Sequence, residues 1–299
     1  MASRFDLQSH STHSDGTLSA AEVVARAAEA GVELLALTDH DTVDGVDEAL
    51  AAGVRHGLQV VPAVEISVVD DGTPEPRELH VVGYRIDHHD AGFANTLAAF
   101  LADRERRTLR MAAALAELGF ELDESEISAR IADGQPIGRP HLANAVLAAP
   151  PNAERLAAEQ IDDVGALIRA YLIEGRPAYR LRETPTVAQA LDAIHATGGL
   201  AVWAHPFWDI DEDDEVLANI DRFRALGLDG VEAFYVTHTR AQTQLLTRRC
   251  EELELLSTGS SDFHGPDNRL FSRFLAFHTY GLRPNLGAIA QLPSSSASR

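Results

Sequence analysis

The chain has 299 residues, of which 45% are hydrophobic and 24% are charged, the composition of a globular enzyme with one large barrel or two ordinary domains. Its formal net charge of −21 excludes a surface that broadly coats a nucleic acid, although bound cations could create a local site for a small anion. The sequence has neither a charged-then-apolar leader nor an apolar run of spanning length, so we expect a cytoplasmic protein.

The first third of the chain alternates apolar strands with amphipathic helices. Ser19 and Glu22 form a capping-box pattern that opens a helix running to Gly31. The segment 67–86 has the pattern of two extended stretches around a polar turn. We also expect strands at 5–7, 34–37 and 60–66, and a helix at 46–56.

Residues 91–182 have a different pattern, rich in Ala, Leu, Arg and Glu at helical spacing and without a strand signal. This predicts a helical insertion of three to five helices. The chain then divides into a discontinuous barrel domain (1–90 and 183–292), the insertion (91–182) and a disordered tail (293–299).

After the insertion the alternation of strands and helices resumes. Thr186 and Gln189 are placed to cap a helix that runs to Thr197. Strands that alternate with helices argue for a parallel sheet, either open or closed into a barrel. We expect strands at 199–204, 230–236 and 255–258, with helices reaching 226 and 253.

Imidazoles and carboxylates follow six of the predicted strands. In α/β barrels, active sites are built at the carboxyl ends of the strands, so these side chains are expected to converge. We leave open whether Asp39 is a ligand, and we expect Asp41 to cap the following helix. The residues concerned are His10, His13, Asp15, Asp39, His40, Asp41, Glu65, His205, His238, Asp262 and His264.

The residue types indicate a site for transition-metal ions. Imidazole mixed with carboxylate, without thiolate, suits zinc, manganese or iron better than calcium or magnesium. The candidates are too many for one tetrahedral ion, so two or three ions fit better, and such clusters serve phosphoryl hydrolysis. Water bound between two cations would lose its proton readily, and the resulting hydroxide would attack phosphorus.

Six motifs in this order resemble those of the PHP family, named after polymerases and histidinol phosphatases. Within it, the small bacterial phosphoesterases that act on nucleotides are the most similar. The resemblance implies an α/β fold, a distorted (β/α)7 barrel carrying a helical insertion subdomain. The motifs are DLQSHSTHSDG (6–16), LTDHDT (37–42), Glu65, LHVVG (79–83), AHP (204–206) and SDFH (261–264).

The resemblance also implies three metal sites, two of which share Glu65. Gln8 departs from the family pattern, which has histidine there, and an amide oxygen is a poorer ligand for these metals. The first site is therefore expected to bind its ion more weakly, and a two-metal enzyme remains an alternative. The implied sets are Gln8, His10, Glu65 and Asp262; Glu65, His80 and His205; and Asp15, His40 and His264.

Substrate contacts are expected from the edges of the insertion. By position, Arg139, His141 and Arg176 resemble residues that contact phosphate in nucleotide-cleaving relatives, and an arginine fork can bind phosphate with two hydrogen bonds. His238 could bind phosphate or protonate the leaving oxygen, so we take His238 and Asp262 as the catalytic candidates.

The sequence is compatible with four functions, to different degrees. The leading one is a phosphomonoesterase for a small metabolite, such as a nucleotide or a nucleoside 3′,5′-bisphosphate. The second is a 5′-to-3′ exoribonuclease acting on short RNA, since the charge disfavours only long polymers. Amide hydrolysis of the amidohydrolase type expects a carboxylated lysine, and this chain has no lysine. A non-catalytic metal-binding module is favoured only by Gln8.

Overall fold

The computed structural model describes residues 4–73 and 76–291, so the tail predicted at 293–299 lies outside the described residues. None of the described helices is long and apolar enough to cross a membrane.

Seven strands form one sheet in sequence order, from β1 to β7. The two outer strands approach each other, because Leu7 N donates to Gly259 O at 3.2 Å and His10 N donates to Phe263 O at 2.8 Å. The sheet is therefore a nearly closed barrel, as predicted. The strands are β1 (Phe5–Asp6), β2 (Leu34–Leu37), β3 (Gln59–Asp70), β4 (Arg77–Tyr84), β5 (Leu200–Trp203), β6 (Gly230–Tyr235) and β7 (Leu256–Ser260).

One strand of the sheet is not parallel, and it belongs to the two extended stretches around a polar turn expected at 67–86. β4 runs antiparallel to both β3 and β5, while the other neighbouring strands pair in parallel. The reason is the short connection between β3 and β4, since a parallel return needs a crossover of a dozen or more residues. As a result, the amino end of β4 lies at the edge where the parallel strands have their carboxyl ends.

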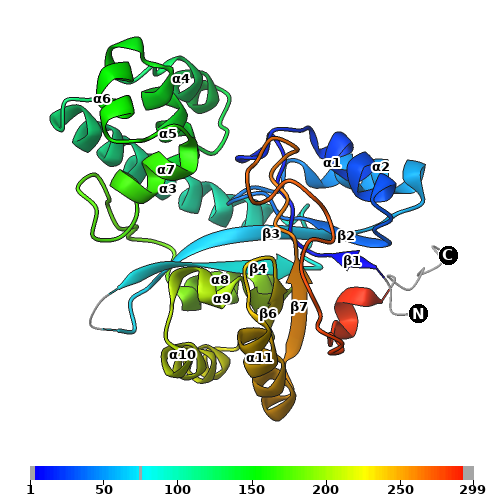
Figure 1. Cartoon of the computed structure of the whole chain (residues 1–299). Coiled ribbons are helices and arrows are strands. Elements are labelled where there is room, and N and C mark those ends of the chain that lie inside the picture. The colour runs from blue at the N-terminus through cyan, green and yellow to red at the C-terminus, as the bar shows by residue number, and fades with distance from the viewer. Residues whose placement is uncertain (1–3, 74–75, 292–299) are drawn as a thin grey trace.

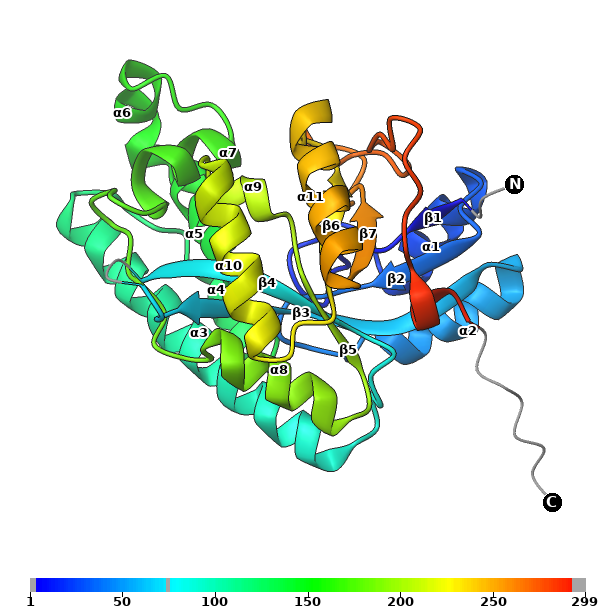
Figure 2. The ribbon, with the colours of Figure 1, turned by 90° about the horizontal axis from the view of Figure 1, so that it is seen from below.

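Helices cover the outside of the barrel, and the insertion forms a separate helical lobe beside it (Figure 1). Viewed from below, the long helix α3 runs alongside α8 (Figure 2). The helices around the barrel are α1 (Ala20–Glu29), α2 (Val46–His56), α8 (Val187–Ala196), α9 (Pro206–Asp209), α10 (Asp213–Ala225), α11 (Arg240–Leu253) and the 3₁₀ turn η3 (Gly287–Ala290).

The helical lobe has its own apolar core, in which Met111, Leu142 and Leu172 are completely buried. A second cluster, around Ile66 and Trp203, lies between the sheet and its covering helices and includes Phe93 and Leu97 of α3. The first part of α3 therefore packs on the barrel, and the division at 91 and 182 stays a prediction. The lobe contains α3 (Ala91–Glu117), α4 (Ser125–Ala132), α5 (Arg139–Ala148), η1 (Pro150–Asn152), α6 (Ala153–Ala158), α7 (Val164–Leu167) and the π-helical turn η2 (Ile168–Leu172).

Both predicted capping boxes are present. The Ser19 hydroxyl accepts from Glu22 N, and the Glu22 carboxylate accepts from Ser19 N in return. Thr186 and Gln189 make the same reciprocal pair at the start of α8. Each box provides acceptors for two backbone N–H groups that would otherwise lack a partner at the start of the helix, and this fixes where the helix begins.

Candidate metal centre

The nine side chains expected to bind metal come together at one edge of the barrel. The loops after β1, β2, β5 and β7 contribute most of them, and Glu65 projects from the middle of β3. His80 lies near the start of β4, so the reversed strand brings it to the same edge as the others. The group consists of Gln8, His10, Asp15, His40, Glu65, His80, His205, Asp262 and His264.

Glu65 lies at the centre of this group and is completely buried. Its Oε1 is 2.7 Å from His80 Nδ1 and 3.2 Å from His205 Nε2. Its Oε2 is 3.1 Å from His10 Nε2 and 3.7 Å from His40 Nδ1. One carboxylate therefore faces four imidazoles, the geometry required of a ligand that bridges two ions.

Two further carboxylates lie at the other end of the group. Asp15 is within 3.7 Å of His10, His40 and His264. Asp262 Oδ1 is 3.1 Å from His10 Nε2 and 3.7 Å from His264 Nδ1. The imidazoles form a continuous row in the order His264, His10, His40, His80 and His205, with ring centroids 4.3, 4.7, 5.0 and 5.2 Å apart.

Several nitrogen and oxygen atoms in this group are buried and have no hydrogen-bond partner. Buried polar atoms are costly when unpaired, so a concentration of them at one point needs a ligand to satisfy it. Imidazole nitrogens and carboxylate oxygens are suitable donors for zinc, manganese or iron. The residues therefore fit divalent ions. The atoms are Gln8 Oε1, His10 Nε2, His40 Nδ1, His80 Nδ1, His205 Nδ1 and Asp262 Oδ1.

Mutual electrostatics favour the charged form of the buried carboxylates. Burial raises the pKa of Glu65, but the imidazoles of His40 and His80 outweigh it and hold this pKa well below its usual range. Asp262 behaves in the same way, and its pKa falls to about 2 because burial is outweighed by His264 and His10. Burial is the largest effect on His40 itself and lowers its pKa to about 3.

Possible ligand atoms that lie close together form groups similar to the ligand sets that the family motifs imply. Within the described residues, three groups of possible ligand atoms lie here: His10 with Glu65 and Asp262, His40 with Glu65 and His80, and His10 with Asp15, His40 and His264. His10 and His40 each join two groups. Gln8, which belongs to the first implied set, lies beside Glu65, and its Nε2 donates to Glu65 Oε2 at 2.8 Å.

A fourth group of possible ligands shares no residue with this centre. Asp47 on α2 faces His88 and His89, with Nε2 to Oδ1 distances of 3.0 and 3.4 Å. Asp47 and His89 are largely exposed. The group is a set of contacts between two neighbouring histidines and one surface carboxylate.

Asp39, directly before His40, stabilises the loop that carries two of the candidate ligands. Asp39 accepts hydrogen bonds from Ser11 N and from the hydroxyls of Ser11 and Ser14, which orders the loop between His10 and Asp15. Asp39 thus holds the ligand loop through hydrogen bonds.

The expectation that Asp41 caps α2 was wrong. The N-cap of α2 is Gly45, which makes no side-chain cap. Instead Asp41 Oδ2 accepts from Arg104 Nη1 at 3.1 Å and from Arg182 Nη1 at 2.9 Å, all three being buried. The pull of two guanidinium groups overrides local capping and, against the effect of burial, lowers the pKa of Asp41.

Three of the residues at this edge have positive φ angles outside glycine. These are Asp41 at 57°, His205 at 31° and Asp262 at 51°. Such backbone conformations cost about 1–3 kcal/mol each and persist where the surrounding structure holds them. At His205 and Asp262 the side chains reach the centre, whereas Asp41 pairs with the two arginines.

His238 lies in an apolar enclosure next to the site, packed against Phe207 and Tyr235. Burial lowers the pKa of His238 to about 4, so its ring is neutral near pH 7. Nδ1 is 3.2 Å from Ala233 O, which makes Nδ1 the protonated nitrogen. Nε2 is then an unpaired acceptor, suited to accept a hydrogen bond rather than to donate a proton.

Tyr235 is a site residue that the sequence patterns did not single out. It ends β6, is buried, and its hydroxyl donates to Asp262 Oδ2 at 2.7 Å. It therefore orients a candidate ligand. A polar-tipped side chain as the last residue of a strand was the available signal.

Two of the expected phosphate contacts begin α5. Arg139 is half-buried, with Nη1 3.7 Å from Glu78 Oε2. His141 is buried, accepts from Gly138 N, and hydrogen-bonds the backbone of Ser14 in the ligand loop. Burial lowers the pKa of His141 to about 4. His141 thus joins the lobe to the ligand loop, whether or not it also contacts substrate.

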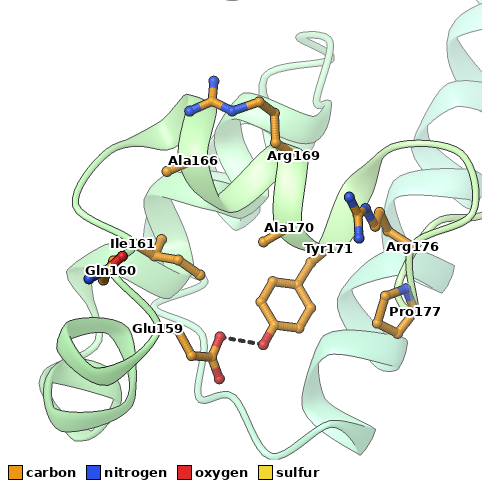
Figure 3. Close-up of a pocket in the computed structure, with 9 residues that line it drawn as sticks. All are labelled: Glu159, Gln160, Ile161, Ala166, Arg169, Ala170, Tyr171, Arg176 and Pro177. Carbon is orange, nitrogen blue, oxygen red and sulfur yellow. Dashed lines mark hydrogen bonds between the residues drawn. The ribbon is translucent and has the colours of Figure 1, made fainter.

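Arg176 lies elsewhere in the lobe. Figure 3 shows it lining a pocket with Glu159, Tyr171 and Arg169, and the Tyr171 hydroxyl donates to Glu159 there. The backbone of Arg176 closes a turn onto Ile173. Its role as a phosphate contact remains a prediction.

Comparison with known proteins places the chain in a family. A family model described as the PHP domain matches residues 6–175, more than half of the chain. The chain belongs to the PHP family. It is 34% identical over 272 residues to a 5′-3′ exoribonuclease of Haemophilus influenzae, covering 89% of this chain and 92% of that protein. It is 30% identical to a 3′,5′-nucleoside bisphosphate phosphatase of Chromobacterium violaceum, covering 87% of each.

Two solved structures are similar over 90% of this chain. One, described as an amidohydrolase from Chromobacterium violaceum with bound sulfate and no metal, has a TM-score of 0.77, 29% identity and 90% coverage of its chain. The other, described as a putative metal-dependent phosphoesterase from Bifidobacterium adolescentis, has a TM-score of 0.73, 27% identity and 91% coverage. Together with the site, these relationships make the protein a metal-dependent phosphoesterase of the PHP family.

Proposed function

We propose that the protein hydrolyses a phosphomonoester of a small metabolite, most specifically a nucleotide or a nucleoside 3′,5′-bisphosphate. The observation that carries the proposal is the convergence of four side chains with unpaired buried atoms around the buried Glu65 carboxylate, at one edge of the barrel. They are His10, His40, His205 and Asp262. The 3′,5′-nucleoside bisphosphate phosphatase among the relatives supports the substrate class.

The proposed ligands are the nine side chains of the centre, with Glu65 as the bridge. When bound there, divalent ions would supply positive charge for the phosphate oxygens and lower the pKa of a water molecule. Two or three ions match the three proximity groups, and manganese, iron or zinc match the donor atoms.

The protein's own side chains would then position the reacting groups. Tyr235 fixes Asp262 through its hydroxyl, so the Asp262 carboxylate faces His10 in one orientation. His238 Nε2 is the proposed acceptor of a hydrogen bond from the substrate at the wall of the site. Arg139, at the start of α5 in the helical lobe, is the proposed contact for a phosphate oxygen.

A second candidate is 5′-to-3′ exoribonuclease activity on short RNA. It is favoured by the exoribonuclease relative, which matches 89% of this chain at 34% identity. The net charge of −21 opposes long polymers but tolerates a few nucleotides. Amide hydrolysis is disfavoured because the chain has no lysine to carry a bridging carboxylate.

Product analysis with defined metal content tests the proposal. Metal-stripped protein is supplied with manganese, iron or zinc and given mononucleotides, nucleoside bisphosphates and short 5′-phosphorylated RNAs. We expect inorganic phosphate from the small substrates, whereas stepwise release of mononucleotides would select the exoribonuclease.

Asp262→Ala should lower phosphate release by more than about 100-fold, since even residues behind metal ligands are worth roughly 10–100-fold. Asp47→Ala is the matched control, because this carboxylate faces histidines on the surface away from the shared cluster. Absence of phosphate with every metal, while Asp262→Ala leaves metal content unchanged, would refute a metal-dependent role for this centre.

A further inference from the structure

Trp208 is unusually exposed for an indole side chain. It follows the candidate ligand His205 in the short helix α9, and 48% of its surface is accessible. Its ring centroid is 5.6 Å from that of Phe271, 6.3 Å from that of Tyr235 and 6.5 Å from that of His205. The indole is therefore supported from behind by other rings and open on another side.

Phe271 is held beside it by the loop that follows β7. Asn268 Oδ1 accepts from Phe271 N at 2.9 Å, and His264 N donates to Phe271 O at 2.9 Å. The Phe271 ring lies 5.4 Å from the His264 ring and 6.1 Å from the Tyr235 ring. The position of this aromatic ring is thus fixed relative to a candidate metal ligand.

Trp208, Tyr235 and Phe271 together form an aromatic wall on one side of the metal centre. Each member touches a candidate ligand: Trp208 the ring of His205, Tyr235 the carboxylate of Asp262, and Phe271 the ring of His264. The centre itself is suited to bind charge, whereas the accessible rings of Trp208 and Phe271 offer flat apolar faces. A ligand that spans both must combine an anionic group with an aromatic one.

We propose that Trp208 and Phe271 form a stacking subsite for the base of a nucleotide substrate whose phosphate lies at the metal centre. The inference rests on the proposed function and adds the residues that select its substrate. Ring pairs at centroid distances of about 4.5–7 Å attract each other, and every base has a face that can stack. Recognition by stacking predicts selection for a base over no base, with little preference among bases.

A matched pair of substrates tests this subsite. Adenosine 5′-monophosphate and ribose 5-phosphate carry the same ester on the same sugar, and only the first has a base. In the metal-loaded enzyme, Trp208→Ala should lower kcat/KM for adenosine monophosphate by about tenfold more than for ribose 5-phosphate, the scale of one lost stacking contact. Trp208→Phe should restore most of that ratio.

Leu226→Ala is the control variant, since Leu226 is an apolar side chain of similar exposure, 44%, at the end of α10. It should leave the ratio of the two kcat/KM values unchanged. Equal losses on both substrates for Trp208→Ala, or no loss on either, would overturn the stacking subsite while leaving the phosphoesterase proposal intact.

Binding without turnover separates the two proposals when neither compound is hydrolysed. Trp208 and the buried Trp203 are the two tryptophans, so fluorescence lost in Trp208→Phe reports on the exposed ring. Adenosine monophosphate should quench this component, and ribose 5-phosphate should not. Quenching without hydrolysis would support the subsite and count against the proposed function, whereas no quenching by adenosine monophosphate would overturn the subsite.

Discussion

At the scale of single residues, Gln8 shows how one substitution can tune a metal centre. It is buried and spends its amide nitrogen on Glu65, while its Oε1 has no hydrogen-bond partner. A carbonyl oxygen in this place is a weaker donor than the imidazole of the family motif. The proposed first site therefore depends mainly on His10 and Asp262.

Gln8→His should raise metal occupancy at this site. An imidazole supplies a stronger donor at nearly the same reach, and we expect the weakest metal affinity to increase by roughly tenfold. Metal per chain, measured by inductively coupled plasma mass spectrometry after dialysis against limiting manganese or zinc, checks this. Gln8→Leu is the control, because it removes the amide without adding a donor.

An unchanged stoichiometry in Gln8→His would mean either that the amide oxygen already serves adequately or that Gln8 lies outside the ligand set. Partial occupancy in the natural protein that becomes full in the variant would establish the position as a ligand site.

Most of the centre could be predicted from sequence because its residues lie in short motifs directly after apolar strands. His40 and His205 are examples, each just after a strand that the apolar runs in the sequence locate. Asp41 was misjudged because its partners, Arg104 and Arg182, are 63 and 141 residues away. A buried ion pair has no sequence period, and local capping was the only visible alternative.

At the scale of elements, Arg182 joins three parts of the chain. Its Nη1 donates to Asp41, its Nη2 to Phe100 O on α3, and its Nε to Thr184 O. Removing one partner of a buried pair leaves an uncompensated charge, which typically costs about 3–5 kcal/mol. This arginine therefore contributes to the packing of the helical lobe against the segment that carries His40.

Arg182→Met should lower the free energy of unfolding by about 3–5 kcal/mol in urea denaturation. Arg249→Met is the matched control, because Arg249 pairs with Asp221 and Glu252 on the surface, and such pairs are worth about 1 kcal/mol or less. Equal losses in the two variants would show that the buried network is no more important than a surface pair.

The orientation of β4 is an element-level property for which the sequence did hold a signal. β3 ends at Asp70 and β4 begins at Arg77, a gap too short for a parallel crossover. The two extended stretches around a polar turn expected at 67–86 correspond to this hairpin, and the reversal explains why His80 lies near the start of its strand rather than after the end.

At the scale of the whole molecule, bound ions should stabilise the folded barrel. The proposed ligands come from segments between Gln8 and His264, so ions that bind them tie the two ends of the barrel together. A ligand that binds the folded state alone stabilises it by about 2.7 kcal/mol at 100 times its Kd.

Metal removal should therefore lower Tm. For a protein of this size we expect a decrease of about 5 °C or more when a chelator strips the ions, measured by differential scanning calorimetry. Adding manganese or zinc back should restore the original value, and Asp262→Ala should show a smaller response. A stripped protein with an unchanged Tm would contradict a structural contribution from the ions.

The clasp on Asp41 has a consequence for how the molecule moves. The helical lobe leaves the barrel through α3, which carries Arg104, and returns to it at Arg182, so entry and exit are pinned to one carboxylate beside His40. The position of the lobe and the position of His40 are therefore coupled through Asp41, and a change that displaces either arginine should also disturb the segment that carries this candidate ligand.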